Sequence, residues 1–288
     1  MYFCNININT YYITMRMITL LLAGLLTMTA GAQTKNTEKR AVLMVHYGTN
    51  NDLSRQKTID VINEKVRKAL PERVVMEAYS SKMVIASLKK RGIKKNSIRE
   101  ALRALYAKGC TDITIQSTHL LPGVMQDLIE KECDKVRFIF DTIRVKQPLL
   151  WCADDCLQLA DVLVRHINAK KNEQVVLVGH GTPGPANAMY TMLDYALQDK
   201  GHTNYHVATI ESYPDMECML RLLKQKKAKR VVLSPLLYIA GNHSAEDIQG
   251  DWREALEKEG YQVTVLTEGL GEMTEVQEWI VSRLRIED

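Results

Sequence analysis

Several features are scarce in this sequence of 288 residues, and each scarcity excludes a class of protein. Only 15 glycines and 7 prolines occur, too few for a fibrous or a disordered chain, whereas 46% of the residues are hydrophobic and can form a sizeable core. The formal net charge is +4, which is too small and too evenly spread for a nucleic-acid-binding protein. The composition is that of a globular protein with a mild preference for anionic ligands.

Cysteine is also scarce, and its spacing offers neither a metal motif nor a disulfide pattern. No two of the six cysteines form a Cys-x-x-Cys pair. The five beyond residue 32 are Cys110, Cys133, Cys152, Cys156 and Cys218. This odd number supports neither a zinc ribbon nor a complete disulfide framework. The spacing of Cys152 and Cys156 leaves open that they form two metal ligands or a strained disulfide bridge, although ordinary packing is the commoner role of such cysteines.

A long uncharged apolar run occurs once, from Met17 to Gln33 behind Arg16. Its core of about nine residues is shorter than the roughly 20 that span a bilayer. It ends in Thr29-Ala30-Gly31-Ala32, a small-x-small cleavage pattern. We therefore expect residues 1–32 to hold a signal peptide cleaved after Ala32, and the mature chain to be exported, periplasmic and not inserted in the membrane. A buried or frayed N-terminal segment is the alternative.

From Arg40 onward, short β-branched runs alternate with amphipathic stretches, which is typical of βα units that build a parallel sheet. The predicted strands cover residues 41–46, 73–79, 111–117, 142–149, 174–179, 205–210, 230–234 and 261–267. The predicted helices cover 52–70, 97–108, 154–169, 185–199, 214–226, 244–259 and 273–286. Ser97 and Glu100 predict a capping box. We expect the last helix to pack across onto another element.

Particular residues recur at a fixed offset of 134 positions. Val45-His46-Tyr47-Gly48-Thr49 matches Gly179-His180-Gly181-Thr182, and Glu77-Ala78-Tyr79-Ser80 matches Glu211-Ser212-Tyr213-Pro214. Such an ordered set of matches indicates an internal duplication. We predict an α/β fold of two similar lobes, 38–170 and 171–288, each with a four-stranded parallel sheet flanked by helices. The active site is expected in the cleft between them, with the metal site on the C-terminal lobe.

Three metal-competent side chains follow three strands of the second lobe: His180, Glu211 and His243. In open parallel sheets, ligands bind beyond the carboxyl ends of the strands, so these side chains should meet at one sheet edge. Two imidazoles and a carboxylate form an open site for cobalt, nickel, iron or zinc. A hydrogen-bonded structural histidine and a helix-capping glutamate are the ordinary alternatives.

A dinucleotide site is a second interpretation of the same segment. Residues 179–184 satisfy Gly-x-Gly-x-x-Gly after a strand, and Glu211 follows the next strand as a ribose-binding acid does. Pro183 and Pro185, however, remove N–H groups from the loop that should hold pyrophosphate. The first lobe has no such fingerprint, so a dinucleotide site is the less favoured interpretation.

The motifs of the second lobe resemble the anaerobic sirohydrochlorin cobaltochelatases, the CbiK type of class II chelatases. The motifs that carry the resemblance are Val178-Gly179-His180-Gly181, Glu211-Ser212-Tyr213-Pro214, Ala240-Gly241-Asn242-His243 and Gly269-Leu270-Gly271-Glu272. The resemblance implies a chelatase-like fold. It also implies insertion of Co²⁺, or of Fe²⁺, into sirohydrochlorin or a related tetrapyrrole during cobalamin-type biosynthesis, without ATP or an organic cofactor.

Roles for individual residues follow from the same resemblance. It implies that His180 accepts a pyrrole proton, with Glu211 as the second catalytic residue, and that His180, Glu211 and His243 hold the metal. First-lobe side chains expected to contact the substrate are His46, Tyr47, Lys82 and His119. Cations expected to pair with its carboxylates are Arg55, Lys82, Lys89 and Arg144. A second metal or an axial haem ligand at His46 or His119 is left open.

Export leaves other functions open, because a cytoplasmic pathway intermediate would have to reach a periplasmic enzyme. One is removal of metal from, or handling of, an imported haem or corrinoid. Another is a two-lobed binding protein that captures a metal or a metallotetrapyrrole without turnover. The expected partner is a tetrapyrrole and not a nucleic acid, and assembly into a homo-oligomer is left open.

Overall fold

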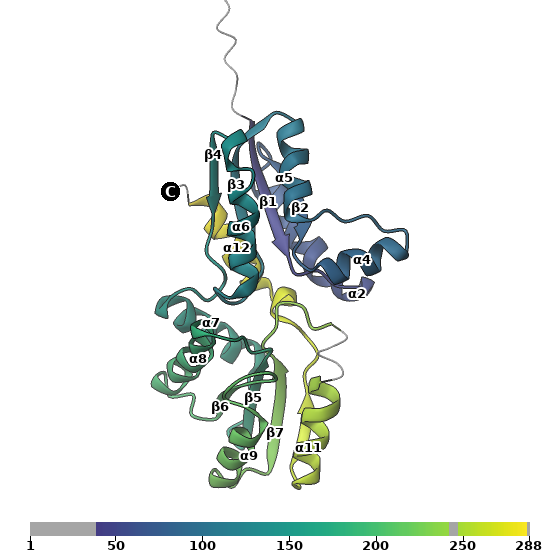
Figure 1. Cartoon of the computed structure of the whole chain (residues 1–288). Helices are drawn as coiled ribbons and strands as arrows, with labels where there is room; N and C mark the ends of the chain where they lie inside the picture. The colour runs from purple at the N-terminus through teal and green to yellow at the C-terminus, as the bar shows by residue number, and fades with distance from the viewer. Residues whose placement is uncertain (1–38, 242–246, 287–288) are drawn as a thin grey trace, which may run out of the picture. The chain divides into compact units, whose positions relative to one another are not determined.

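Eight parallel strands in two sheets of four form the framework of the chain in the computed structural model (Figure 1). The structure describes residues 39–241 and 247–286. The predicted signal peptide and the predicted ligand His243 therefore lie outside the described residues. The described residues all belong to one compact unit.

The first sheet has the strand order β2-β1-β3-β4. Its strands are β1 (Lys39–His46), β2 (Val74–Tyr79), β3 (Cys110–Ser117) and β4 (Thr142–Val145). The helical segments between and after them are α2 (Asp52–Arg55), η1 (Gln56–Asp60), α3 (Val61–Ala69), α4 (Lys82–Lys90), α5 (Ile98–Ala107), α6 (Val124–Asp134), η2 (Arg137–Ile139) and α7 (Ala153–Ile167).

The second sheet repeats this order as β6-β5-β7-β8. Its strands are β5 (Glu173–Gly179), β6 (Tyr205–Thr209), β7 (Arg230–Pro235) and β8 (Gln262–Val265). The accompanying helical segments are η3 (Pro185–Asn187), α8 (Ala188–Asp199), α9 (Met216–Gln225), η4 (Asp247–Trp252), α11 (Arg253–Lys258), η5 (Leu270–Glu272) and α12 (Thr274–Arg285). The fold class predicted from the sequence is confirmed.

The central strand of each sheet is buried along most of its length, as a strand with both faces covered must be. Every residue from Ala41 to His46 in β1 is buried, and so is every residue from Val175 to Gly179 in β5. Two strands are at least three residues shorter than predicted: β8 covers Gln262–Val265 of the expected 261–267, and β4 ends at Val145, four residues before the expected end. Pro148 explains the early end of β4, because it has no N–H group with which to continue a ladder.

The predicted helices match the observed helices less completely than the predicted strands match the observed strands. The predicted capping box at α5 is present, since Ser97 accepts from the backbone of Glu100 and Glu100 accepts from Ser97 N. The predicted 52–70 helix contains a five-residue π-helical segment, η1. Two helices, α4 and α6, were not predicted. They have 9 and 11 residues and bury two and three side chains respectively.

Two helices pack across the predicted lobe boundary at residues 170 and 171. Figure 1 shows α7 beside α8 of the second half and α12 beside the first sheet, and α12 contacts α3 and β3. Arg283 of α12 donates to the carbonyl oxygens of Pro148 and Leu149, at 2.6 and 3.1 Å, and pairs with Asp155. The expected packing of the last helix is confirmed. The lobe boundaries themselves remain a prediction.

Two further observations concern the described residues. All five of their cysteines are free thiols, so no bridge joins Cys152 to Cys156. Within residues 39–241 and 247–286, no helix has the length and apolar character needed to cross a bilayer.

Candidate active site

His180 and Glu211 lie together at the carboxyl edge of the second sheet. His180 directly follows β5, and the parallel ladder continues past β6, where Ile210 N donates to Gly179 O and Glu211 N donates to His180 O, each at 2.9 Å. This pairing brings His180 Nδ1 to 3.6 Å from Glu211 Oε2. Both side chains are more than half exposed, at 58% and 66%. The expected meeting of these two side chains at one sheet edge is confirmed.

The hydrogen bond of His180 to its own loop determines which ring nitrogen is free. Nδ1 lies 3.1 Å from the carbonyl oxygen of Gly181, which only accepts hydrogen bonds. This bond requires the proton on Nδ1, and it leaves the Nε2 lone pair for a metal ion or for a proton. The carboxylate of Glu211 lies close to the same ring, with Oε2 3.6 Å from Nδ1.

Close packing accounts for the glycines that flank His180. A Cβ atom on Gly179 would lie 2.3 Å from Cε1 of the buried Tyr190. Gly181 has a φ of +88°, and a Cβ there would lie 2.9 Å from Ser212 Cβ. Gly181 N donates to Tyr190 Oη at 3.4 Å, and Thr182 N donates to Asn187 Oδ1 at 3.2 Å. Because these N–H groups already have partners, the loop does not offer them to a pyrophosphate.

The turn that carries Glu211 is held at its far end. The carbonyl oxygen of Pro214 accepts from Thr209 N at 2.7 Å, and that of Tyr213 accepts from Asn187 Nδ2 at 2.6 Å. Asp215 then caps α9 by accepting from Cys218 N at 2.9 Å. The carboxylate of Glu211 therefore projects into solvent from a turn that is fixed by main-chain hydrogen bonds.

The third predicted ligand, His243, lies outside the described residues. The chain leading toward it is described as far as Gly241, and Leu236 N at its start donates to Val178 O at 2.8 Å. Among the residues that the structure describes, no group of three His, Cys, Asp or Glu side chains could hold a metal ion. The three-ligand site therefore stays a prediction, of which the structure places two members together.

The first-lobe counterpart of His180 is enclosed. His46 is fully buried, with Nδ1 3.0 Å from Thr118 Oγ1 and Nε2 3.0 Å from Asn63 Oδ1. Asn63 Nδ2 donates to Glu77 Oε2 at 2.8 Å, so its Oδ1 faces His46 and Nε2 carries the ring proton. Burial lowers the pKa of His46 to about 4. A neutral ring with two occupied nitrogens presents no lone pair to a metal.

The other predicted substrate contacts differ in exposure. His119 is buried, its Nε2 lies 3.2 Å from Ser80 Oγ, and burial lowers its pKa to about 3. Nδ1 of His119 has no hydrogen-bond partner among the described residues. Tyr47 is 44% exposed, and Lys82 is exposed in the first turn of α4. Only Tyr47 and Lys82 of the four are open to solvent, and all four contacts remain predictions.

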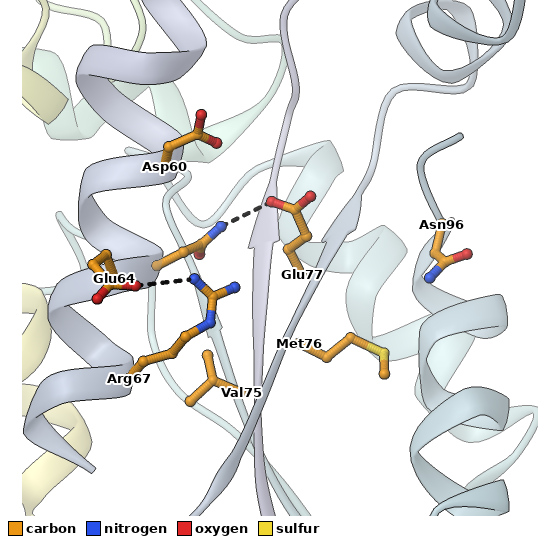
Figure 2. Close-up of a pocket in the computed structure, with 8 residues that line it drawn as sticks. Asp60, Glu64, Arg67, Val75, Met76, Glu77 and Asn96 are labelled. Carbon is orange, nitrogen blue, oxygen red and sulfur yellow. Dashed lines mark hydrogen bonds and ion pairs between the residues drawn. The ribbon is translucent and has the colours of Figure 1, made fainter. Parts of the chain in front are cut away.

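A cavity of about 520 Å³ lies between α3 and β2, and neither His180 nor Glu211 lines it. Two of its acidic side chains have partners beside the cavity: Asn63 donates to Glu77 at 2.8 Å, and Arg67 pairs with Glu64 at 3.6 Å, as Figure 2 shows for the second pair. Glu77 also pairs with Lys95. Glu77 is the counterpart of Glu211 in the internal repeat. The carboxylate of Glu77 is neutralised by Lys95, whereas His180 and Glu211 in the second half form an exposed pair.

A family model described as "Cobalt chelatase (CbiK)" matches residues 40–287. The chain belongs to the CbiK cobalt chelatase family. It is 30% identical over 252 residues to the sirohydrochlorin cobaltochelatase of Salmonella typhimurium, which covers 85% of this chain and 95% of that protein. It is 29% identical over 242 residues to the sirohydrochlorin cobaltochelatase CbiKC of Nitratidesulfovibrio vulgaris, covering 81% and 85%. The resemblance drawn from the motifs is confirmed.

A solved structure shows that the CbiK-type fold extends to more distant chelatases. SirB from Bacillus subtilis, determined with Fe³⁺, superposes with a TM-score of 0.66 at 18% identity, and the match covers 86% of this chain and 94% of that one. At this identity the similarity establishes the fold. The roles of individual residues have to come from the geometry of this chain.

Proposed function

We propose that this CbiK family member is a sirohydrochlorin cobaltochelatase, which inserts Co²⁺ into the tetrapyrrole without ATP or an organic cofactor. The observation that carries the proposal is the exposed His180–Glu211 pair, 3.6 Å apart at the carboxyl edge of the second sheet. Family membership supports the same activity. The metal ion is a substrate of the reaction and not a resident cofactor.

The proposed reaction exchanges two pyrrole protons for one metal ion. The two pyrrole N–H bonds break, bonds from the ring nitrogens to Co²⁺ form, and two protons leave. Nε2 of His180 accepts one of them, because Nδ1 is already protonated and bonded to Gly181 O. Glu211 stabilises the imidazolium that results, and solvent receives the second proton at this exposed site.

The same side chains suit capture of the ion before transfer. We propose that Nε2 of His180, the carboxylate of Glu211 and His243 hold Co²⁺ facing the ring, with water in the remaining positions. Imidazole and carboxylate bind first-row divalent ions, and such an open site can exchange water for ring nitrogens. Fe²⁺ fits this ligand set equally well, so the ligands alone do not select between Co²⁺ and Fe²⁺.

Anaerobic incubation of the purified protein with sirohydrochlorin and Co²⁺ tests the proposal. We expect a protein-dependent change in the absorption spectrum of the macrocycle, faster than the uncatalysed reaction. Equal rates with and without protein would reject insertion. Release of iron from added haem would indicate the metal-removal alternative, and stoichiometric binding without turnover would indicate a capture protein.

We also propose that the mature chain is exported to the periplasm as a soluble protein. The support is the apolar run from Met17 to Gln33 with its small-x-small ending. N-terminal sequencing of the periplasmic fraction should give a chain that begins at Gln33. Recovery of the uncleaved chain from the cytoplasm would reject this proposal. Light scattering of the same preparation would determine whether the chain assembles into a homo-oligomer, which the sequence leaves open.

A further inference from the structure

The segment of residues 82–95, which contains α4 and the turn after it, carries six cationic side chains and no acidic one. Two of the six have acidic partners, since Arg91 pairs with an aspartate and Lys95 pairs with a glutamate. The other four are exposed and form no ion pair within residues 39–241 and 247–286: Lys82, Lys89, Lys90 and Lys94. We call these four side chains the α4 basic surface.

The acid that faces this surface is already engaged elsewhere. Glu100 in α5 interacts electrostatically with Lys94 and Lys89, but it also accepts hydrogen bonds from Ser97 N and Ser97 Oγ, each at 2.8 Å. The bonds from Ser97 lower the pKa of Glu100, and the two lysines add to that effect. One carboxylate thus faces two of the four lysines, and the surface keeps an excess of positive charge.

The α4 helix starts at the carboxyl edge of the first sheet. Ser80 N donates to His46 O at 2.8 Å, and Ser81 N donates to Tyr47 O at 3.2 Å. These bonds hold the chain that enters α4 beside the end of β1. The first lysine of the surface, Lys82, follows directly.

An apolar cluster holds α4 close to the second half of the chain. Val84 and Leu88 of α4 are buried in this cluster, and Ile239 from the loop after β7 packs against it. β7 pairs with β5, the strand that ends directly before His180. The α4 basic surface is therefore carried by a helix that is anchored near the carboxyl edges of both sheets.

The structure also distinguishes among the four cations that the sequence predicts for the substrate carboxylates. Arg55 and Arg144 each pair with an aspartate. Lys82 and Lys89 belong to the α4 basic surface. An anionic ligand would have to compete with an existing partner at either arginine, whereas at the α4 basic surface it meets an excess of positive charge.

We infer that the α4 basic surface attracts the polycarboxylate tetrapyrrole to the protein by long-range electrostatics, before the ring binds beside His180 and Glu211. Charges of one sign at a binding site raise the association rate of an oppositely charged ligand by about 10- to 1,000-fold. Exposed charges at the rim of a site act on association more than on dissociation. This inference rests on the proposed function and adds the residues that set the rate of substrate binding.

Stopped-flow mixing of the purified full chain with sirohydrochlorin, under anaerobic conditions and without metal, tests the inference. We expect the triple variant Lys82→Glu, Lys89→Glu, Lys90→Glu to associate about tenfold more slowly than the wild type at about 0.1 M salt. At about 1 M salt, where the screening length falls to about 3 Å, the difference should shrink to less than about twofold. The dissociation rate constant should change by less than about threefold.

A matched variant separates local attraction from a change in net charge. Lys171→Glu, Lys224→Glu, Lys229→Glu changes the net charge by the same amount at three exposed lysines. They lie near the amino-terminal ends of β5 and β7, at the opposite edge of the second sheet from His180. This control should associate within about twofold of the wild-type rate, because screening at about 0.1 M salt acts over about 10 Å.

A milder variant keeps the test decisive if the glutamates prevent folding. Glutamine at Lys82, Lys89 and Lys90 removes the charge without adding acids, and it should give a smaller loss in the same direction. Wild-type association by the folded α4 variants, an equal loss in the control, or a loss that persists undiminished at about 1 M salt would overturn the inference. A wild-type chain that binds no sirohydrochlorin would reject the proposed function itself.

Discussion

Asn63 joins two ionisable groups inside the first half of the chain, and its replacement by alanine should destabilise the fold without affecting cobalt. The side chain is 2% exposed. Its oxygen lies 3.0 Å from His46 Nε2, and its nitrogen donates to Glu77 Oε2 at 2.8 Å. Asn63→Ala removes both bonds and leaves the Nε2–H group of His46 buried with no acceptor.

The size of the effect follows from what each partner retains. An unsatisfied buried donor costs about 1–3 kcal/mol, and a lost hydrogen bond to a charged group roughly 1.5–3 kcal/mol. Glu77 keeps its pair with Lys95, which reduces the second contribution. We therefore expect Asn63→Ala to lower the free energy of unfolding by about 2–4 kcal/mol.

Urea unfolding followed by circular dichroism measures this loss as a shift in the midpoint at constant slope. Asn172→Ala, at an exposed turn residue, is the matched control and should stay within about 0.5 kcal/mol of the wild type. Cobalt affinity of the folded variant should not change. A loss below about 0.5 kcal/mol would refute the reasoning that the His46 network is structural, as would a second cobalt site that appears when Asn63 is removed.

Two further predictions concern stability. Burial lowers the pKa of His46 to about 4, of His119 to about 3 and of His206 to about 4. In the unfolded chain these three histidines bind protons near pH 6.5, whereas in the folded chain they stay neutral to a lower pH. The free energy of unfolding is therefore at its full value above about pH 6.5 and decreases as the pH falls toward 4, by roughly 3 kcal/mol for His46 alone. Equal urea midpoints near pH 7.5 and near pH 5 would contradict this. Arg283→Met should cost about 3 kcal/mol, because it removes two bonds to buried carbonyl groups and leaves Asp155 without its cation. Thermal unfolding checks it, with Arg285→Met at the exposed end of α12 as the control.

The strands and their grouping could be predicted because each central strand is a continuous buried run of apolar residues. The His180–Glu211 pair was predictable for a related reason, since both residues follow neighbouring parallel strands. The 134-residue offset also indicated that the two halves repeat, and the equal strand orders agree with it.

The offset could not show that the two halves use their matching residues differently. His46 and His180 occupy the same place in the motif, but His46 is enclosed by Asn63 and Thr118, which come from other elements. The hydrogen bond between Ser54 and Ala240 could not be predicted from the sequence either, because the two residues are 186 positions apart and neither residue type indicates a functional site. Gly271 belongs to a motif that is visible in the sequence. Only the structure explains why that position is glycine, because a Cβ atom there would collide with the main chain of Tyr238.

The initial rate of cobalt insertion in two histidine variants tests the central claim most directly. His180→Ala removes the proposed proton acceptor, and His202→Ala removes a half-buried histidine in the loop before β6, at the opposite end of that strand from Glu211. We predict that sirohydrochlorin and Co²⁺ react with His180→Ala at the uncatalysed rate and with His202→Ala at the wild-type rate, both variants unfolding cooperatively. Wild-type turnover by folded His180→Ala would contradict the account.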